Sequence, residues 1–142
     1  MLLDANVLLY SVDRSSRFHE PCAVWVSDAF AGSRRIGLPW QTIGAFLRIA
    51  THPRVFARPL SPDQAWATVE HWLRAPICWV PATSRDTARI LGELVSDLDL
   101  RGNLVTDAQL AALAIEHGVA VVSADTGFAR FPSVRWINPL TG

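Results

Sequence analysis

Lysine is absent from this chain. All 13 basic residues are arginine, and 13 acidic residues balance them, so the formal net charge is zero. A neutral chain carries no overall basic signature of nucleic-acid binding. No uninterrupted apolar stretch approaches the roughly 20 residues that a membrane-spanning helix needs, and no basic segment precedes an apolar one at the start, as it would in a secretory signal. The sequence therefore predicts no membrane association.

Cysteine is scarce. Cys22 and Cys78 are the two cysteines, and no metal-binding spacing connects them. We expect both to be free thiols in the core of a cytoplasmic protein. Half of the 142 residues are hydrophobic and 18% are charged, which is enough apolar material for a real core. This length favours a single domain over residues 1–142.

One stretch of the chain lacks acids. Between Asp28 and Asp63 there is no carboxylate, but there are five arginines and His52. Two interpretations remain open. The segment is either a solvated surface with a compositional bias toward arginine, or a surface that contacts phosphate, for which the planar guanidinium is well suited. The arginines of this stretch are Arg34, Arg35, Arg48, Arg54 and Arg58.

Short apolar runs alternate with segments of helical periodicity. Ser61-Pro62 and Ser84 are typical helix starts, and Gly118 is a typical helix end. Strands alternating with helices predict a three-layer α/β/α sandwich with a mostly parallel sheet. The expected strands are 1–4, 35–38, 77–80, 119–122 and 134–137. The expected helices begin at Ala5 and near Pro21 and then span 40–51, 61–75, 84–97 and 106–117.

Three aspartates stand at the ends of apolar runs or at helix starts. Asp4 and Asp125 follow expected strands, and Asp107 lies in an expected first helical turn. Together they would repel one another unless a cation neutralised them. Mg²⁺, with Mn²⁺ as a substitute, suits such a carboxylate set and promotes phosphodiester hydrolysis. Each acid also has a local alternative: Asp4 as a helix cap, Asp107 as a partner of the helix dipole, and Asp125 as a turn residue.

Several segments together resemble one protein family. The chain is similar to PIN-domain proteins, and among them to the VapC-type ribonuclease toxins of toxin–antitoxin pairs. The resemblance covers almost the whole length and keeps the family's order. The segments that carry it are Leu2–Tyr10, Ala45–Phe56, Gly102–Ala108, Ala111–Gly118 and Val121–Phe128 with Phe131.

The resemblance implies a single PIN-like nuclease domain. Its activity would be a Mg²⁺-dependent endoribonuclease that hydrolyses phosphodiester bonds of tRNA, rRNA or mRNA. Asp4 and Asp107 would be the metal ligands, and Asp125 would be a further catalytic acid acting through water. Asn6 and Thr106 would give polar support to these acids. Thr106 also has a competing interpretation as the cap of the following helix, which we favour.

The resemblance also implies partners, namely an RNA substrate, a VapB-like antitoxin and a second copy in a homodimer. Arg48 and Arg54 are the candidate RNA contacts. Helix 61–75, with its two tryptophans, is the candidate for either the antitoxin groove or the dimer interface. Trp40 could stack on a base, but its size favours a place in the core.

One position departs from the family pattern. The family usually carries a glutamate just before the Phe-Leu-Arg segment, and this chain has Ala45 there. Glu116 lies about 13 Å along its helix from Asp107, too far to share an ion directly. Ala45 therefore keeps open a degenerate PIN domain that binds RNA or a protein without cleavage. A small-molecule phosphatase is disfavoured, because the chain has no glycine-rich phosphate loop and no Asp-x-Asp pair after the first strand.

Overall fold

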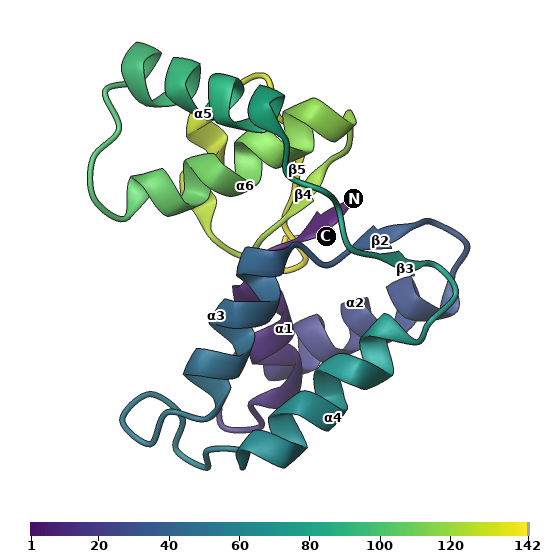
Figure 1. Cartoon of the computed structure of the whole chain (residues 1–142). Coiled ribbons are helices and arrows are strands. Elements are labelled where there is room, and N and C mark those ends of the chain that lie inside the picture. The colour runs from purple at the N-terminus through teal and green to yellow at the C-terminus, as the bar shows by residue number, and fades with distance from the viewer. Residues whose placement is uncertain (142) are drawn as a thin grey trace.

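A computed structural model describes residues 1–141, and these residues form five strands, six α-helices and one 3₁₀-helix (Figure 1). The strands are β1 (Leu2–Leu3), β2 (Ile36–Gly37), β3 (Cys78–Trp79), β4 (Val121–Val122) and β5 (Trp136–Ile137). The helices are α1 (Ala5–Val12), α2 (His19–Ala31), α3 (Trp40–Ala50), α4 (Pro62–Leu73), α5 (Arg85–Asp97) and α6 (Leu104–His117), and the 3₁₀-helix is η1 (Thr126–Arg130).

The five strands form one sheet in the order β3-β2-β1-β4-β5, and every neighbouring pair is parallel. The chain therefore builds outward from β1 to β2 and β3, then crosses back to place β4 on the other side of β1. Right-handed crossovers in opposite directions put their helices on opposite faces of a sheet. Figure 1 shows this result, with α5 and α6 on one side of the sheet and α1 to α4 on the other. The predicted α/β sandwich is confirmed.

Each strand divides its side chains between the two faces, because successive residues of a strand point in opposite directions. Leu2 and Val121 pack in the cluster that contains the buried face of α6. Leu3 and Val122 pack in the cluster that contains α1, α3 and α4. Two residues per strand are therefore enough to join both helical layers through the sheet.

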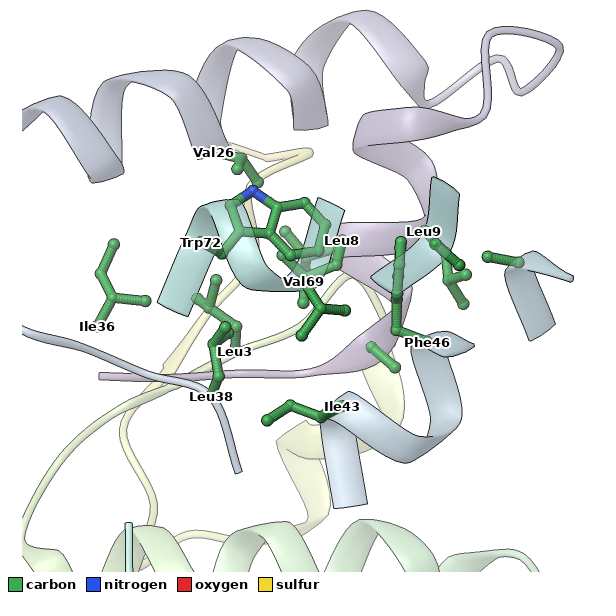
Figure 2. Close-up of a cluster of buried hydrophobic side chains, with 14 of the residues drawn as sticks. Leu3, Leu8, Leu9, Val26, Ile36, Leu38, Ile43, Phe46, Val69 and Trp72 are labelled. Carbon is green, nitrogen blue, oxygen red and sulfur yellow. The ribbon is translucent and has the colours of Figure 1, made fainter. Parts of the chain in front are cut away.

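Trp72 on α4 lies at the centre of the larger cluster (Figure 2). Its indole meets the ring of Phe46 edge-on, with centroids 5.1 Å apart, and stacks at 6.5 Å on Phe30. The side chain is 7% exposed. Figure 2 shows Leu3, Leu8, Val69 and Phe46 around it, so residues from β1, α1, α3 and α4 meet at one indole.

The predicted helix signals are confirmed at three ends. Ser61 and Ser84 each form a capping box, in which the serine oxygen accepts from a backbone N–H of the first turn and the third helical residue bonds back to the serine N–H. Gly118 ends α6 in the left-handed region, with φ +64 and ψ 36. Glycine adopts that conformation without the steric cost that a side chain brings.

Two predicted helix starts are wrong by two residues. α2 begins at His19, so Pro21 lies within the first turn and not at its first position. α6 begins at Leu104, so Thr106 is inside the helix and is not its cap. The turn bonds explain the earlier start of α6, because the N–H groups of Leu104 and Val105 already bond to Arg101 and Gly102 carbonyls.

Two side chains lie nearer the surface than the sequence predicted. Trp40, expected in the core, stands at the first position of α3 and is 78% exposed, because the buried residues of this helix begin only at Thr42. Cys78 is half-buried on the edge strand β3, whereas Cys22 is buried, and both thiols are free. None of the helices within residues 1–141 is long and apolar enough to cross a membrane.

Candidate functional site

The sheet has its topological switch point between β1 and β4. The chain leaves these neighbouring parallel strands in opposite directions, and their carboxyl ends open a crevice of the kind in which α/β proteins bind ligands. Asp4 follows β1 directly, and Ser123 follows β4 directly. The register Leu3↔Val122 places these two residues side by side at that edge.

A hydrogen-bond network holds the carboxylate of Asp4. Its Oδ1 accepts from the backbone N–H of Ala5 at 2.7 Å, so the expected capping role is present. Its Oδ2 accepts from the Ser123 hydroxyl at 2.7 Å and from Nδ2 of Asn6 at 3.1 Å. Asn6 also bonds Ser123 Oγ at 3.0 Å and accepts the Ala124 N–H at 3.1 Å. The predicted supporting role of Asn6 thus has a structural basis: it ties α1 to the loop after β4.

Burial and hydrogen bonding act on the pKa of Asp4 in opposite directions. Removal of the carboxylate from water raises the pKa, and the bonds from Ser123 and Ala5 lower it again, because both donors favour the charged form. The negative charge of Asp125 adds a further increase. The net shift of the pKa is upward, because the effect of burial exceeds that of the two hydrogen bonds.

Asp107 reaches the same site from the first turn of α6. Its pKa is raised to about 6, first by burial and then by the charges of Asp125 and Asp4, while Arg130 lowers it. The charges of Asp125 and Asp4 act on Asp107, and that of Asp125 acts on Asp4, so three acids that are distant in sequence lie near one another. Carboxyl groups whose pKa is raised by burial and by neighbouring acids are typical of functional sites, which use clustered charge for chemistry or ion binding.

Asp125 joins the cluster from the start of η1. Its Oδ1 accepts the Gly127 N–H at 2.8 Å, so the turn interpretation is also correct. A Cβ at position 127 would stand 3.0 Å from that oxygen, tighter than ordinary contact, so glycine allows this close approach. The side chain is exposed at the mouth of the site.

The donor set fits a hard divalent cation in its chemistry, because the three acids offer carboxylate oxygens and each oxygen has a second lone pair. The spacing is wider than a closed metal cage. Among residues 1–141, no group of three or more histidine, cysteine, aspartate or glutamate side chains is drawn together tightly enough to surround an ion. A cation bound by one or two carboxylates, with water completing its shell, is what this geometry can accommodate.

Other predicted residues lie outside the cluster. Thr106 is exposed on α6, one residue before Asp107. Arg48 is exposed in the last turn of α3, and Arg54 is exposed in the following loop. The hydroxyl of Thr42, in the first turn of α3, bonds the carbonyl of Leu3 beside the site at 2.8 Å. Arg48 lies six residues further, roughly 9 Å along the helix axis.

Sequence reasoning missed two residues of the site. Ser123 is fully buried and connects Asp4, Asn6 and the N–H of Asp125. One feature could have identified Ser123: it directly follows the β-branched residues of β4, just as Asp4 directly follows the apolar residues of β1. Arg130 supplies a positive charge to Asp107, and its Nε donates to the Gly127 carbonyl at 2.8 Å. A single arginine in a loop carries no comparable pattern.

Glu116 does not replace the missing fourth acid. Its carboxylate accepts hydrogen bonds from the hydroxyls of Ser84 and Thr87. These bonds lower its pKa, because they favour the charged form. Glu116 therefore fastens α6 to the start of α5, away from the carboxylate cluster.

Comparison with known proteins adds a family and a set of relatives. The family described as "PIN domain" matches residues 1–134. Ribonuclease VapC37 of Mycobacterium tuberculosis is 41% identical over 138 residues, which cover 97% of this chain and 96% of that protein. Ribonuclease VapC43 of the same species is 36% identical over 142 residues, covering 100% and 97%.

Solved structures agree in fold. The VapBC2 complex from Rickettsia felis, bound to a promoter DNA fragment, contains a chain that aligns with a TM-score of 0.72 at 16% identity and 96% coverage of both chains. VapBC-1 from nontypeable Haemophilus influenzae aligns with a TM-score of 0.71 at 17% identity, covering 98% of this chain and 97% of that one. At these identities the likeness establishes a shared backbone architecture.

Proposed function

The chain belongs to the PIN-domain family, and we propose that it is a metal-dependent endoribonuclease of the VapC type, the toxic component of a toxin–antitoxin pair. The observation that carries the proposal is the cluster of Asp4, Asp107 and Asp125 at the switch point of the sheet, where the charges of Asp125 and Asp4 add to burial in raising the pKa of Asp107. The names of the relatives, "Ribonuclease VapC37" and "Ribonuclease VapC43", support RNA as the substrate.

Asp4 and Asp107 would hold Mg²⁺, with Mn²⁺ as a substitute. When bound, the ion supplies a water of lowered pKa and polarises a phosphoryl oxygen. Ser123 and Asn6 both donate to Oδ2 of Asp4, and these two bonds restrict the orientation of its carboxylate. Asp125 is exposed and would accept a hydrogen bond from a water at the mouth of the site. Arg130 brings a positive charge to the same place, suited to a phosphate of the RNA strand.

The proposed protein partners are a VapB-like antitoxin and a second copy of the chain. An apolar groove of about 300 Å³ runs between α3 and α4, and Trp66 on its wall is 49% exposed. An exposed apolar surface of this kind favours a protein partner. The groove supports helix 61–75 as the site of one of the two interfaces. Its lining residues are Trp40, Ile43, Gly44, Leu47, Trp66, Leu73 and Val80.

The test compares two site variants with a matched control. Asp4→Asn and Asp107→Asn each remove one charge at nearly constant volume, and Asp63→Asn removes an exposed charge in the first turn of α4. We expect both site variants to lose Mg²⁺-dependent RNA cleavage by at least 100-fold and to relieve growth arrest, with the control unchanged. Cleavage at the wild-type rate in both site variants would refute the proposal.

Ala45 supports a second candidate, in which the domain binds RNA or a protein without cutting. Position 45 stands three residues after Thr42 on the same face of α3 and offers no carboxylate to the crevice. This alternative predicts RNA binding that persists in chelator, with no product at high Mn²⁺. Cleavage products in Mn²⁺ that disappear with chelator would exclude it.

A further inference from the structure

At the amino-terminal ends of the strands, opposite the carboxylate cluster, the surface has a hollow of about 340 Å³ with an excess of positive charge. Three arginines line it. Arg34 and Arg35 directly precede β2, and Arg135 directly precedes β5. All strands are parallel, so these residues share the amino-terminal edge, while Asp4 and Ser123 stand at the carboxyl-terminal edge.

The positive charge of the hollow has no acidic neighbour among its described lining residues. The hollow is lined by arginines, apolar residues and glycine, without a carboxylate among the lining residues that the structure describes. Of the 13 arginines, Arg74, Arg89 and Arg101 have carboxylate partners within ion-pair distance, and the three arginines of the hollow, like the other seven, have none among residues 1–141. Within the described part of the chain, the hollow therefore brings three positive charges together without a carboxylate to pair with them.

The amino group of Met1, which also lines the hollow, is affected by the positive charge of the arginines. The pKa of the Met1 amino group is lowered, first by burial and then by the positive charges of Arg34 and Arg35. That amino group donates to the Arg35 carbonyl at 3.2 Å, which ties the start of β1 to the segment before β2. A neighbouring positive charge disfavours a second one, and an anion in the hollow would relieve the repulsion.

One of the three guanidinium groups is held in place before any ligand arrives. The guanidinium carbon of Arg35 lies 4.8 Å from the ring centroid of Trp79 on β3, a cation–π contact. The Trp79 ring also contacts the His117 ring edge-on, with the ring centroids 5.2 Å apart. An arginine fixed on an aromatic ring loses less side-chain entropy when it binds, which favours recognition by a planar fork of donors.

We propose that Arg34, Arg35 and Arg135 form a second ligand site, which binds a phosphate group at the amino-terminal edge of the sheet. Arginine presents paired donors that match phosphate oxygens. The volume falls in the range of ligand pockets and leaves room for a group attached to the phosphate. The phosphate comes either from a free phosphate compound or from the backbone of an RNA strand. Met1 and Asp4 stand at the two ends of β1, three residues apart, so about 10 Å separates the hollow from the carboxylate cluster along the strand direction.

Amide NMR shifts of the ¹⁵N-labelled chain test the proposal. Gly118, Val119 and Ala120 are among the residues that line the hollow, so their amide signals should respond to a ligand bound there. Inorganic phosphate is titrated at constant ionic strength with chloride as the competing anion. We expect saturable shifts at these amides in the wild type. The double variant Arg34→Gln/Arg135→Gln should bind phosphate at least ten-fold more weakly.

The control is Arg14→Gln/Arg85→Gln, which removes two exposed arginines outside the hollow and should bind phosphate as the wild type does. Arg35 stays in place because it packs on Trp79. Thermal unfolding gives a second measurement. Without phosphate, the Arg34→Gln/Arg135→Gln variant should be at least as stable as the wild type, since repulsion is relieved. With phosphate, the melting temperature of the wild type should rise and that of the variant should not.

A non-cleavable 2′-O-methyl oligonucleotide separates the two sources. If it displaces phosphate from the 118–120 amides, the site takes RNA backbone. If phosphate shifts these amides and the oligonucleotide does not, the site takes a free phosphate compound. Absence of saturable shifts with both probes, or equal binding by the wild type and the Arg34→Gln/Arg135→Gln variant, overturns the proposal. These measurements do not involve cleavage, so their outcome is independent of the nuclease proposal.

Discussion

The hydroxyl of Ser123 donates a 2.7 Å hydrogen bond to Oδ2 of Asp4, across 119 positions of the chain. The same oxygen of Ser123 accepts from Nδ2 of Asn6 and from the N–H of Asp125. One buried hydroxyl thus connects the end of β1, the first turn of α1 and the start of η1. Its geometry follows from the parallel pairing of β1 with β4.

Replacement of Ser123 by alanine should weaken the fold and the proposed activity together. Ser123→Ala leaves the Asn6 amide and the Asp125 N–H each without one partner, a cost of about 1–3 kcal/mol. The pKa of Asp4 should rise further, because the Ser123 bond lowers it in the wild type. Urea unfolding and the pH dependence of RNA cleavage measure the two effects. Ser133→Ala, at an exposed position, is the control. Wild-type stability and pH profile in Ser123→Ala would contradict the assigned network.

Asp107→Asn should stabilise the protein above pH 6 and leave it unchanged near pH 3.5. The folded pKa of about 6 lies above the ordinary aspartate value of 3.8, so the folded state binds the proton more readily and stability falls as pH rises between these values. The carboxylate is half-exposed, and after discounting for solvent screening we expect about 1 kcal/mol. At this chain length such a gain raises the melting temperature by roughly 2–4 °C.

Thermal unfolding from pH 3.5 to 8 measures the difference between Asp107→Asn and the wild type. The control is Asp63→Asn on the surface of α4, for which the two curves should run parallel. A gain from Asp107→Asn that is the same at both ends of the pH range would show that the effect is not electrostatic.

Ala45→Glu should tighten Mg²⁺ binding by the proposed site on the order of ten-fold, because the number of ligand charges sets the affinity for such ions. The half-buried new carboxylate should also destabilise the fold while Mg²⁺ is absent. The control is Gly44→Glu, which adds the same charge at an exposed position with no atoms around its Cβ. Calorimetric Mg²⁺ titration distinguishes the two, and equal affinities would place Ala45 outside the site.

The two tryptophans of α4 should differ sharply in their contribution to stability. Trp72→Ala removes the indole at the centre of the core and should cost about 3–5 kcal/mol, a large part of the stability of a typical domain. Trp66→Ala, half-exposed on the groove, should cost less than about 1 kcal/mol. Urea unfolding compares them. A similar loss for both would mean that the groove wall belongs to the core.

The element order was predictable because its signals are local. Ser61, Ser84 and Gly118 mark helix ends by their own chemistry, and each was assigned correctly. The start of α6 was not, because the turn bonds from Leu104 and Val105 to Arg101 and Gly102 extend a helix that no capping side chain announces. The burial of Trp40 was predicted wrongly for a related reason. Hydrophobicity indicates that a tryptophan favours burial, but it does not show whether a particular position of a helix faces the core.

By itself, the sequence determined the alternation of strands and helices and the acids that follow apolar runs, since these depend on neighbours along the chain. Only the tertiary structure decided that β4 pairs with β1. That pairing brings Ser123 beside Asp4, and it places the charges of Asp4 and Asp125 near enough to Asp107 to raise its pKa. It also gathers Arg34, Arg35 and Arg135 at the opposite edge. Pairing between distant strands depends on backbone hydrogen bonds that any residue can form, so it leaves no mark in the sequence.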